Sequence, residues 1–244
     1  MTAELSDTRV LGALRFTDAV TALPIDVPLV LTAPGVRWIR NRRAQWVIAS
    51  APGLSAHEAA FDTPPDSPDL GTMRVDFAVR DPSGRWLPRT GSVALPRDPD
   101  GAHRAQPTSL FLVPDVALYP APAAPTQRGW AVVRASIAGT PPSSVLPNAL
   151  VRVVRDSDGV RIGAGMSDAR GEALVAIEGI PSALLGDGDG PVVATDVAVH
   201  LQVIWDPDAG PAPDPDDLET RHAELLVRES AAHVASGRVL TMTL

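Results

Sequence analysis

The chain contains no cysteine among its 244 residues. A disulfide, a thiolate nucleophile and a zinc or iron–sulfur site with cysteine ligands are therefore excluded. A protein without cysteine fits a reducing compartment best, although it also tolerates conditions outside a cell. Lysine is missing too, so all 21 basic residues are arginine; together with the 25 prolines this indicates GC-rich coding, and we attach no function to it.

Long apolar runs are also missing. No stretch of about 18 consecutive apolar residues is present, so the sequence predicts no insertion into a membrane. The first ten residues carry Glu4 and Asp7 and lack the basic region and apolar run of a signal peptide. We therefore expect a cytoplasmic protein, or one carried within an assembled particle.

Basic charge is scarce relative to acidic charge, and the formal net charge is -8. Binding to nucleic acid needs a clustered basic surface, so this charge predicts no nucleic-acid partner. The densest basic cluster, formed by Arg37, Arg40, Arg42 and Arg43, is too short to change this expectation. The 45% hydrophobic content is typical of a globular protein, and 244 residues can form one large β-domain or two of ordinary size.

Apolar residues recur with the two-residue period of β-strands. In the clearest case, every second residue from Val197 to Trp205 is apolar. Shorter runs of the same kind, each bounded by glycine, proline or aspartate, are found at 75–79, 130–134, 149–154, 172–177 and 223–228. The sequence therefore predicts an all-β fold.

Two segments have helical character. Residues 55–60 are expected to form a helical turn, and 222–234 has some helical propensity. For 223–228 we favour a strand, because Ser236-Gly237 and a last apolar stretch at 239–244 follow it. These two final segments are then expected to pair across a hairpin or bend.

Proline, alanine and glycine dominate a central stretch that also carries Leu110, Phe111, Leu112 and Tyr119. A free linker would not carry such apolar residues, so we expect a connector that packs against a domain. Residues 207–217, rich in proline and aspartate, are expected to form a long exposed loop. The predicted organisation is a first β-sandwich at 8–98, the connector at 99–128 and a second β-sandwich at 129–244.

Two turns of similar sequence indicate a repeat, V-R-D-P-S-G at 79–84 and V-R-D-S-D-G at 154–159. An aspartate at the start of a tight turn bonds the backbone ahead of it, and a glycine at its end tolerates positive φ. The turn residues expected from this pattern are Asp81, Gly84, Asp156 and Gly159.

A further turn, S-D-A-R-G at 167–171, directly precedes a strand within the region 132–181. This region resembles the carboxypeptidase regulatory-like, or transthyretin-like, β-sandwich, and the amino-terminal half matches the same pattern more loosely. The resemblance implies two tandem Ig-like or transthyretin-like sandwiches, in which Asp168 caps the turn and Gly171 takes a backbone conformation that a Cβ would block. Such modules are usually non-catalytic building blocks.

A second similarity concerns assembly. The runs at 130–134 and 167–175 are similar to accessory proteins of bacterial contractile injection, or phage-tail-like, particles. We therefore expect a non-enzymatic structural protein that assembles with protein partners, including copies of itself. The alternative is a β-sandwich module that binds carbohydrate or another surface ligand.

The sequence shows no motif for catalysis or for a cofactor. The five histidines form no HxH or HExxH pattern, and no serine lies in GxSxG. The nucleotide-binding motifs GxxxxGK[ST] and GxGxxG are also absent. The acidic loops at 186–190 and 206–217 lack the spacing of an EF-hand, so we expect solvated loops rather than calcium sites. We therefore predict no catalytic residue, no cofactor and no metal ion.

Tryptophan is the one aromatic residue type that could serve recognition, because its face packs on a sugar ring or anchors an interface. Aromatic residues make up only 4% of the chain, so core or interface roles are favoured over a sugar-binding platform. The candidate interface or ligand residues are Trp38, Trp46, Trp86, Trp130 and Trp205.

Overall fold

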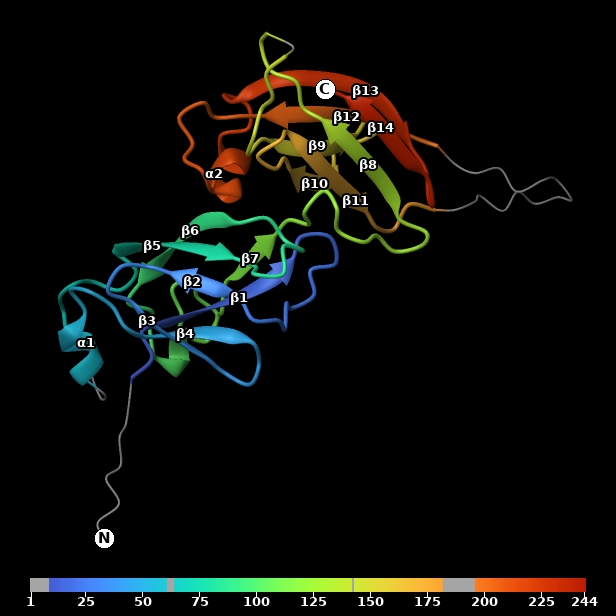
Figure 1. Cartoon of the computed structure of the whole chain (residues 1–244). Coiled ribbons are helices and arrows are strands. Elements are labelled where there is room, and N and C mark those ends of the chain that lie inside the picture. Colours follow the sequence, from blue (N-terminus) through green and yellow to red (C-terminus); the bar gives the residue numbers. More distant parts are fainter. Residues whose placement is uncertain (1–8, 61–63, 142, 182–195) are drawn as a thin grey trace, which may run out of the picture. The chain divides into compact units, whose positions relative to one another are not determined.

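A computed structural model describes residues 9–60, 64–141, 143–181 and 196–244 (Figure 1). It is mostly β-strand (43%) with only 6% helix, in several sheets, which confirms the predicted all-β class. The chain divides into two compact units of interleaved segments. Unit 1 comprises Met1–Thr17, Leu23–Val79 and Thr90–Ala117, and unit 2 comprises Asp18–Ala22, Arg80–Arg89 and Leu118–Leu244. The domain boundaries expected from the sequence stay a prediction.

Two sheets form the frame of unit 1, with strand orders β3-β4-β1-β7 and β2-β5-β6. Phe77 of β5 joins them, because its ring contacts Phe16 of β1 and Trp38 of β3 edge-to-face, each at 6.2 Å between centroids. Its elements are β1 Gly12–Asp18, β2 Val30–Thr32, β3 Arg37–Arg40, β4 Gln45–Ser50, α1 Ser55–Ala59, β5 Met73–Arg80, β6 Arg89–Leu95, the 3-10 helix η1 Gly101–His103 and β7 Asp115–Leu118. The helical turn expected at 55–60 is confirmed by α1.

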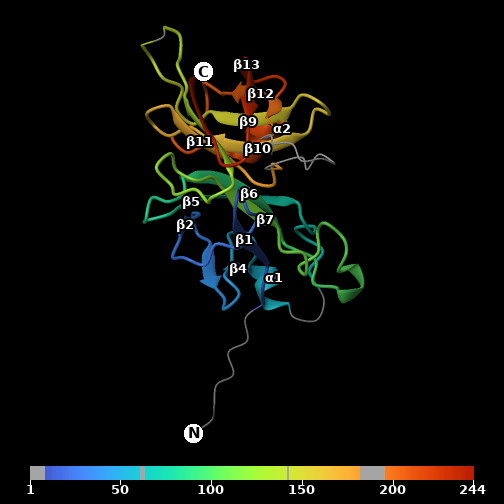
Figure 2. The same cartoon turned by 90° about the vertical axis from the view of Figure 1, so that its right-hand side faces the viewer.

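Unit 2 is also built from two sheets, with orders β10-β9-β12-β13 and β11-β8-β14. Figure 2 labels β9 to β13 in a second view. Its elements are β8 Ala131–Ser136, β9 Leu150–Arg155, β10 Arg161–Met166, β11 Glu172–Ile177, β12 Val197–Ile204, α2 Pro215–Thr220, β13 Leu226–Val234 and β14 Val239–Thr243. The runs predicted as strands at 130–134, 149–154, 172–177 and 197–205 coincide with β8, β9, β11 and β12. These four strands contribute most of the apolar core between the sheets.

Both faces of the β9–β12 sheet are covered. Its inner face adds Val199, Leu201 and Val203 to the core, all fully buried. Its outer face packs Leu150 and Ile204 into a second, smaller cluster, together with Tyr119, Met166 and Leu218 of α2. The two-residue period of β12 decides which side chain meets which cluster.

The two final strands differ from the predicted hairpin. β13 begins at Leu226 and pairs antiparallel with β12, whereas β14 pairs parallel with β8 in the other sheet. The short link between them contains Gly237, whose positive φ of 70° lets the chain change sheets. Crossing to the second sheet brings Leu240 and Met242 against the core, which a hairpin with β13 would not do.

Residues 207–217 were expected to be an exposed loop, and this prediction is wrong in its second half. Helix α2 begins at Pro215, which is buried, as is Pro213. The side chain of Asp214 caps the helix by accepting a hydrogen bond from the backbone N–H of Asp216. Leu218 then packs against the outer face of the sheet, so burial of one leucine ties the segment down.

The connector is only partly packed. Tyr119 is buried, whereas Phe111 and Leu112 are 57% and 44% exposed, against the expectation. Their loop is held by Arg97, whose guanidinium donates to the carbonyl groups of Pro107, Ser109 and Leu112. These hydrogen bonds from Arg97 hold the backbone of the loop in place, so the loop does not depend on burial of its apolar side chains.

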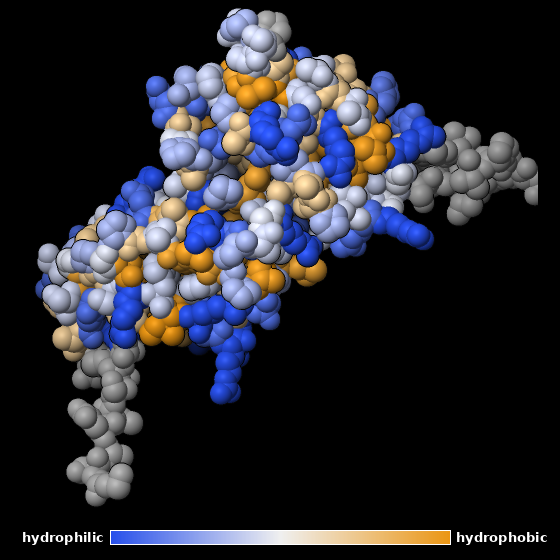
Figure 3. All heavy atoms as spheres, in the orientation of Figure 1, coloured by the Kyte–Doolittle hydropathy of each residue, from blue (hydrophilic) through white to orange (hydrophobic). Residues whose placement is uncertain are grey.

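Exposed apolar side chains occur in both units and are interspersed with polar ones. On the face shown in Figure 3, apolar residues form small groups that hydrophilic residues separate. Single exposed apolar residues are normal for a protein surface, so only those that meet another feature call for an explanation. The large exposed apolar residues are Leu23, Ile39, Phe111, Leu112, Val145, Val160, Leu226, Val227 and Val239.

Candidate functional site

The turn at Asp81 is built around its carboxylate. That carboxylate accepts hydrogen bonds from the backbone N–H groups of Ser83, Arg85 and Trp86, and Gly84 has a φ of 71°. Partial burial alone would raise the pKa of Asp81, but the hydrogen bonds from Ser83, Trp86 and Arg85 outweigh it and hold this pKa below its ordinary value. Asp81 is therefore a structural residue that stays ionised in the folded protein.

The turn before β11 is also held by an aspartate carboxylate that accepts backbone hydrogen bonds. The carboxylate of Asp168 accepts from the backbone N–H groups of Arg170 and Glu172. Gly171 has a φ of 75°, and a Cβ there would lie 2.9 Å from the carbonyl oxygen of Ile137. Both residues therefore serve the backbone of the turn.

Asp156 lies in a turn but does not cap it. Its Oδ1 atom is 2.5 Å from Nδ1 of His200 on the neighbouring strand β12. The turn itself is capped by Asp158, whose Oδ1 accepts from the backbone N–H of Val160, and Gly159 has the expected positive φ of 68°. The two similar turn sequences thus use different aspartates, because the second turn offers two.

The structure disperses the five tryptophans and leaves none of them fully exposed. Trp38 and Trp46 lie on the paired strands β3 and β4 of unit 1. In unit 2, Trp86 is buried and donates its Nε1–H to Asp18, while Trp130 packs beside a small apolar cluster. They form no common platform. Trp205 lines a groove formed by described residues.

Trp205 faces a groove of about 380 Å³ at one end of the second sandwich. Its Nε1–H donates to the carbonyl oxygen of Pro147 at 3.1 Å, which fixes the orientation of the indole ring. Apolar side chains and small polar groups share the wall, and a volume of this size holds a small ligand or one large side chain. The lining residues are Ala138, Gly139, Thr140, Ser144, Val145, Leu146, Trp205, Val227 and Arg228.

Arg228 is the cationic group among these lining residues. It lies opposite the buried Val203 in the β12–β13 pairing, so its side chain leaves β13 on the inner face of the sheet. Its Nη1–H donates to the carbonyl oxygen of Ala138 at 3.2 Å, and no described carboxylate pairs with it. The groove therefore combines an aromatic face, apolar contacts and an arginine, which suits binding rather than acid–base catalysis.

The groove adjoins an open sheet edge. Strand β13 is nine residues long and ends its sheet, with β12 as its paired neighbour (Figure 1). Leu226 and Val227 at its start are 42% and 49% exposed. An edge strand presents unpaired backbone N–H and C=O groups to any chain that lies beside it. The sequence predicted a strand here, but the meeting of this edge with Trp205 depends on its pairing with β12.

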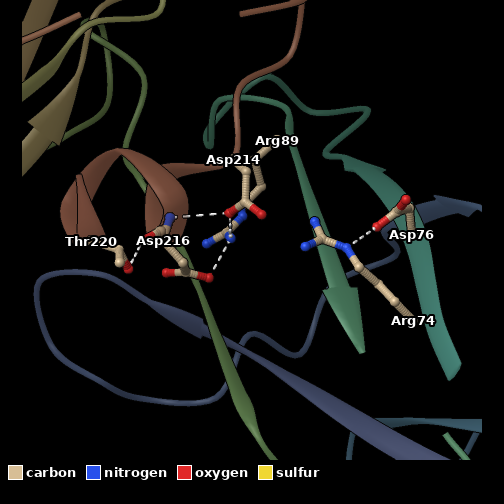
Figure 4. A network of polar contacts seen from close by, with 6 residues as sticks. All are labelled: Arg74, Asp76, Arg89, Asp214, Asp216 and Thr220. Carbon is tan, nitrogen blue, oxygen red and sulfur yellow. Dashed lines mark hydrogen bonds and ion pairs between the residues drawn. The ribbon is translucent and has the colours of Figure 1, made fainter. Parts of the chain in front are cut away.

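An ion-pair network within unit 2 anchors α2, since Arg89, the first residue of β6, belongs to this unit. Arg89, whose side chain is 2% exposed, donates to Asp214 at 3.0 Å and to Asp216 at 2.6 Å (Figure 4). Across the outer face of the sheet, Glu219 of α2 pairs with Arg152 and Arg161. The acidic loop that the sequence offered as a calcium candidate is thus neutralised by arginine.

Metal binding finds no support within the described ranges, where no three histidine, aspartate or glutamate side chains are grouped to hold an ion. The acidic loop at 186–190 lies outside the described residues. In the other acidic loop, Arg221 pairs with both Asp206 and Asp217. No helix in the described part of the chain is long and apolar enough to cross a membrane.

Comparison of the chain with protein-family models, with curated proteins and with solved structures found no match. The resemblance to the carboxypeptidase regulatory-like sandwich therefore stays a prediction that rests on the turn at 167–171 and on the strands around it. Likewise, the similarity to accessory proteins of injection particles stays a prediction. Function is therefore inferred from the groove, the open edge and the charges.

The Asp81 turn makes a prediction about pH. The lowered pKa means that ionised Asp81 stabilises the fold above the pKa of an unfolded aspartate, and that this contribution disappears as the pH falls through the folded value. The variant Asp81→Asn should therefore be less stable at pH 7, by roughly 1–3 kcal/mol for the charged hydrogen bonds. Thermal melts between acid and neutral pH should show this difference shrinking at low pH. A difference that stays constant would contradict the role of the charge.

The Arg89 network predicts a loss of stability from one substitution. In Arg89→Met, Asp214 and Asp216 lose their buried partner, and unfolding free energy should fall by roughly 1–3 kcal/mol, since Asp216 remains solvated. The matched control is Arg74→Met, which breaks the exposed Arg74–Asp76 pair (Figure 4) and should cost under about 1 kcal/mol. Urea unfolding followed by circular dichroism measures both. Equal losses would show that burial does not strengthen the network.

Proposed function

We propose that the protein is a non-enzymatic structural module that assembles with copies of itself through the edge strand β13. The observation that carries this proposal is a nine-residue edge strand whose first two residues are exposed and apolar, the second of them, Val227, lining the groove. Addition of a strand to such an edge supplies backbone hydrogen bonds, while flanking pockets take side chains. Structural proteins use such contacts to join subunits.

Strand β13 has only part of the usual protection of an edge, an irregular register and the inward-pointing Arg228, both near its start. Proteins commonly block edges with short strands, proline or clustered charge. β13 has no proline, and its charged residues besides His233 are Arg228 and Glu229. Arg228 points to the inner face and bonds Ala138, which leaves the backbone edge itself accessible.

A second copy is a suitable occupant because β13 is compatible with pairing to itself. An antiparallel pair centred on Ser230 aligns all nine residues, with Arg228 opposite Ala232 and Glu229 opposite Ala231. Centring it on Arg228 or Glu229 instead would place like charges opposite each other, which is unfavourable. Such a pair has two-fold symmetry, the commonest symmetry of soluble oligomers.

The larger assembly that we propose is a phage-tail-like contractile injection particle, with the chain carried in the particle or in the cytoplasm. Support comes from the similarity of 130–134 and 167–175 to accessory proteins of such particles, and from the carboxypeptidase regulatory-like pattern of strands and turns. Genes for tail sheath and baseplate proteins beside this gene would support the proposal. A neighbourhood without them in the source genome would count against it.

The edge-strand proposal predicts the effect of Val227→Glu. A carboxylate at this position, 49% exposed in the wild type, would lose its hydration between the paired strands, so self-association should weaken at least about tenfold. Size-exclusion chromatography with light scattering over a concentration series measures this. The control is Val160→Glu, which is 48% exposed and distant from β13 in the sheet order, and it should associate as the wild type does. A wild-type chain that stays monomeric throughout would refute self-assembly.

A second candidate function is favoured by Trp205. The half-buried indole, the hydroxyl groups of Thr140 and Ser144 and the guanidinium of Arg228 all line one groove. Aromatic faces with nearby donors are the means by which β-sandwich modules hold carbohydrate, so the groove supports binding of a surface sugar.

The carbohydrate alternative predicts a fluorescence change from one tryptophan. An acidic sugar found on a glycan array should quench the emission of the wild type, and Trp205→Leu should abolish both the quenching and the binding. The control Trp46→Leu should leave binding intact, because Trp46 lies in unit 1 and not in the groove. An array without any bound glycan would sink this alternative and leave the assembly proposal standing.

A further inference from the structure

A basic segment stands out in this acidic chain. Between Val27 and His57 there are four arginines and no aspartate or glutamate. The remaining 17 arginines of the chain are set against all 29 of its acidic residues. The positive charge is therefore concentrated on one segment of unit 1, which contains β3, β4 and the turn that joins them.

The turn between β3 and β4 is rigidly built. The side-chain oxygen of Asn41 accepts hydrogen bonds from the backbone N–H groups of Arg43 and Gln45, and its amide group donates to the side chain of Gln45 at 2.8 Å. Ala44 takes a positive φ of 57° to close the turn. Arg42 and Arg43, both exposed, are thus presented at a fixed turn rather than on a loose loop.

Three of the four arginines lack an acidic partner among the described residues. Arg40 pairs with Asp26, but none of the carboxylates in the described ranges pairs with Arg37, Arg42 or Arg43. This contrasts with unit 2, where several arginines, Arg89, Arg152 and Arg221 among them, are engaged by carboxylates. We call the segment Arg37–Arg43 the arginine ribbon.

The ribbon also contains an open sheet edge and an apolar contact. β3 ends its sheet, with β4 as its paired neighbour, and Ile39 is 44% exposed. Trp38 faces inward, where it contacts Phe77, so Ile39 leaves the strand on the other face. The ribbon therefore presents to solvent the guanidinium groups of its arginines, the side chain of Ile39 and the backbone edge of β3.

We propose that the arginine ribbon binds an acidic segment of a partner protein in an extended conformation. Carboxylates of the segment pair with the guanidinium groups of Arg37, Arg42 and Arg43, for which the arginine fork is suited. The backbone of the segment adds to β3, and an apolar side chain contacts Ile39. Charge complementarity of this kind gives specificity and speeds association.

The charge distribution favours a protein segment over a nucleic acid. A polyanion longer than the ribbon would meet the acidic remainder of the chain and be repelled. The acidic helix α2 of a second copy is a poor occupant, because its Asp214, Asp216 and Asp217 are already paired with arginine within their own unit. This inference involves unit 1 and is independent of the self-assembly proposed for β13.

The test uses the full chain and a fluorescein-labelled peptide of alternating glutamate and valine, with fluorescence anisotropy as the readout. The wild type should bind the peptide, and the affinity should fall steeply between roughly 50 and 300 mM salt as exposed charges are screened. The triple variant Arg37→Glu, Arg42→Glu, Arg43→Glu should bind at least about tenfold more weakly. Exposed arginines tolerate this change, and a thermal melt verifies that the variant is folded.

The matched control is the triple variant Arg80→Glu, Arg104→Glu, Arg128→Glu. It changes the net charge equally at three exposed arginines that no described carboxylate pairs with, and it should bind the peptide within about twofold of the wild type. Equal losses in both variants, or no binding by the wild type, would overturn the proposal. Tighter binding to duplex DNA or to phosphatidylserine vesicles than to the peptide would overturn it as well. Val227→Glu should leave peptide binding unchanged, which separates this surface from β13.

Discussion

The fold of unit 2 depends on strand β12, which lies between β9 and β13 in its sheet and buries every second side chain against the facing sheet. Val199, Leu201 and Val203 are completely buried in the core, and β12 is paired along its length with both β9 and β13. In a chain without cysteine, this packing has no disulfide to assist it. The strand order that results from it leaves β13 at an edge and brings Trp205, directly after β12, to the mouth of the sandwich.

Arginine side chains make several of the polar contacts that hold this fold together. Arg97 donates hydrogen bonds to backbone carbonyl groups of a loop, and Arg89 pairs with Asp214 at the start of α2. Arg228 donates to the carbonyl oxygen of Ala138 at the groove. The planar guanidinium, with five donors, suits each of these tasks. Those arginines are engaged within the fold, whereas Arg42 and Arg43 at the β3–β4 turn have no acidic partner among the described residues.

Both proposed surfaces arise from the same architectural constraint. A sandwich of two open sheets always leaves edge strands, and each edge must be blocked or used. At β13 the edge is long and apolar at its start, which suits a second copy. At β3 the edge is short and flanked by guanidinium groups that no described carboxylate neutralises, which suits an acidic segment.

Local features of this protein can be predicted from its amino-acid sequence. Alternation of apolar residues predicted β8, β9, β11 and β12, and an aspartate followed by glycine located the turns at Asp81 and Asp168, because both signals act within a few residues. Features that depend on distant partners came from the tertiary fold. Long-range pairing sent β14 to β8 instead of β13, burial of Leu218 formed α2 where a loop was expected, and the pairing of β13 with β12 brought Trp205 beside Arg228. Strand order and burial depend on contacts across the whole chain, and no short pattern encodes them.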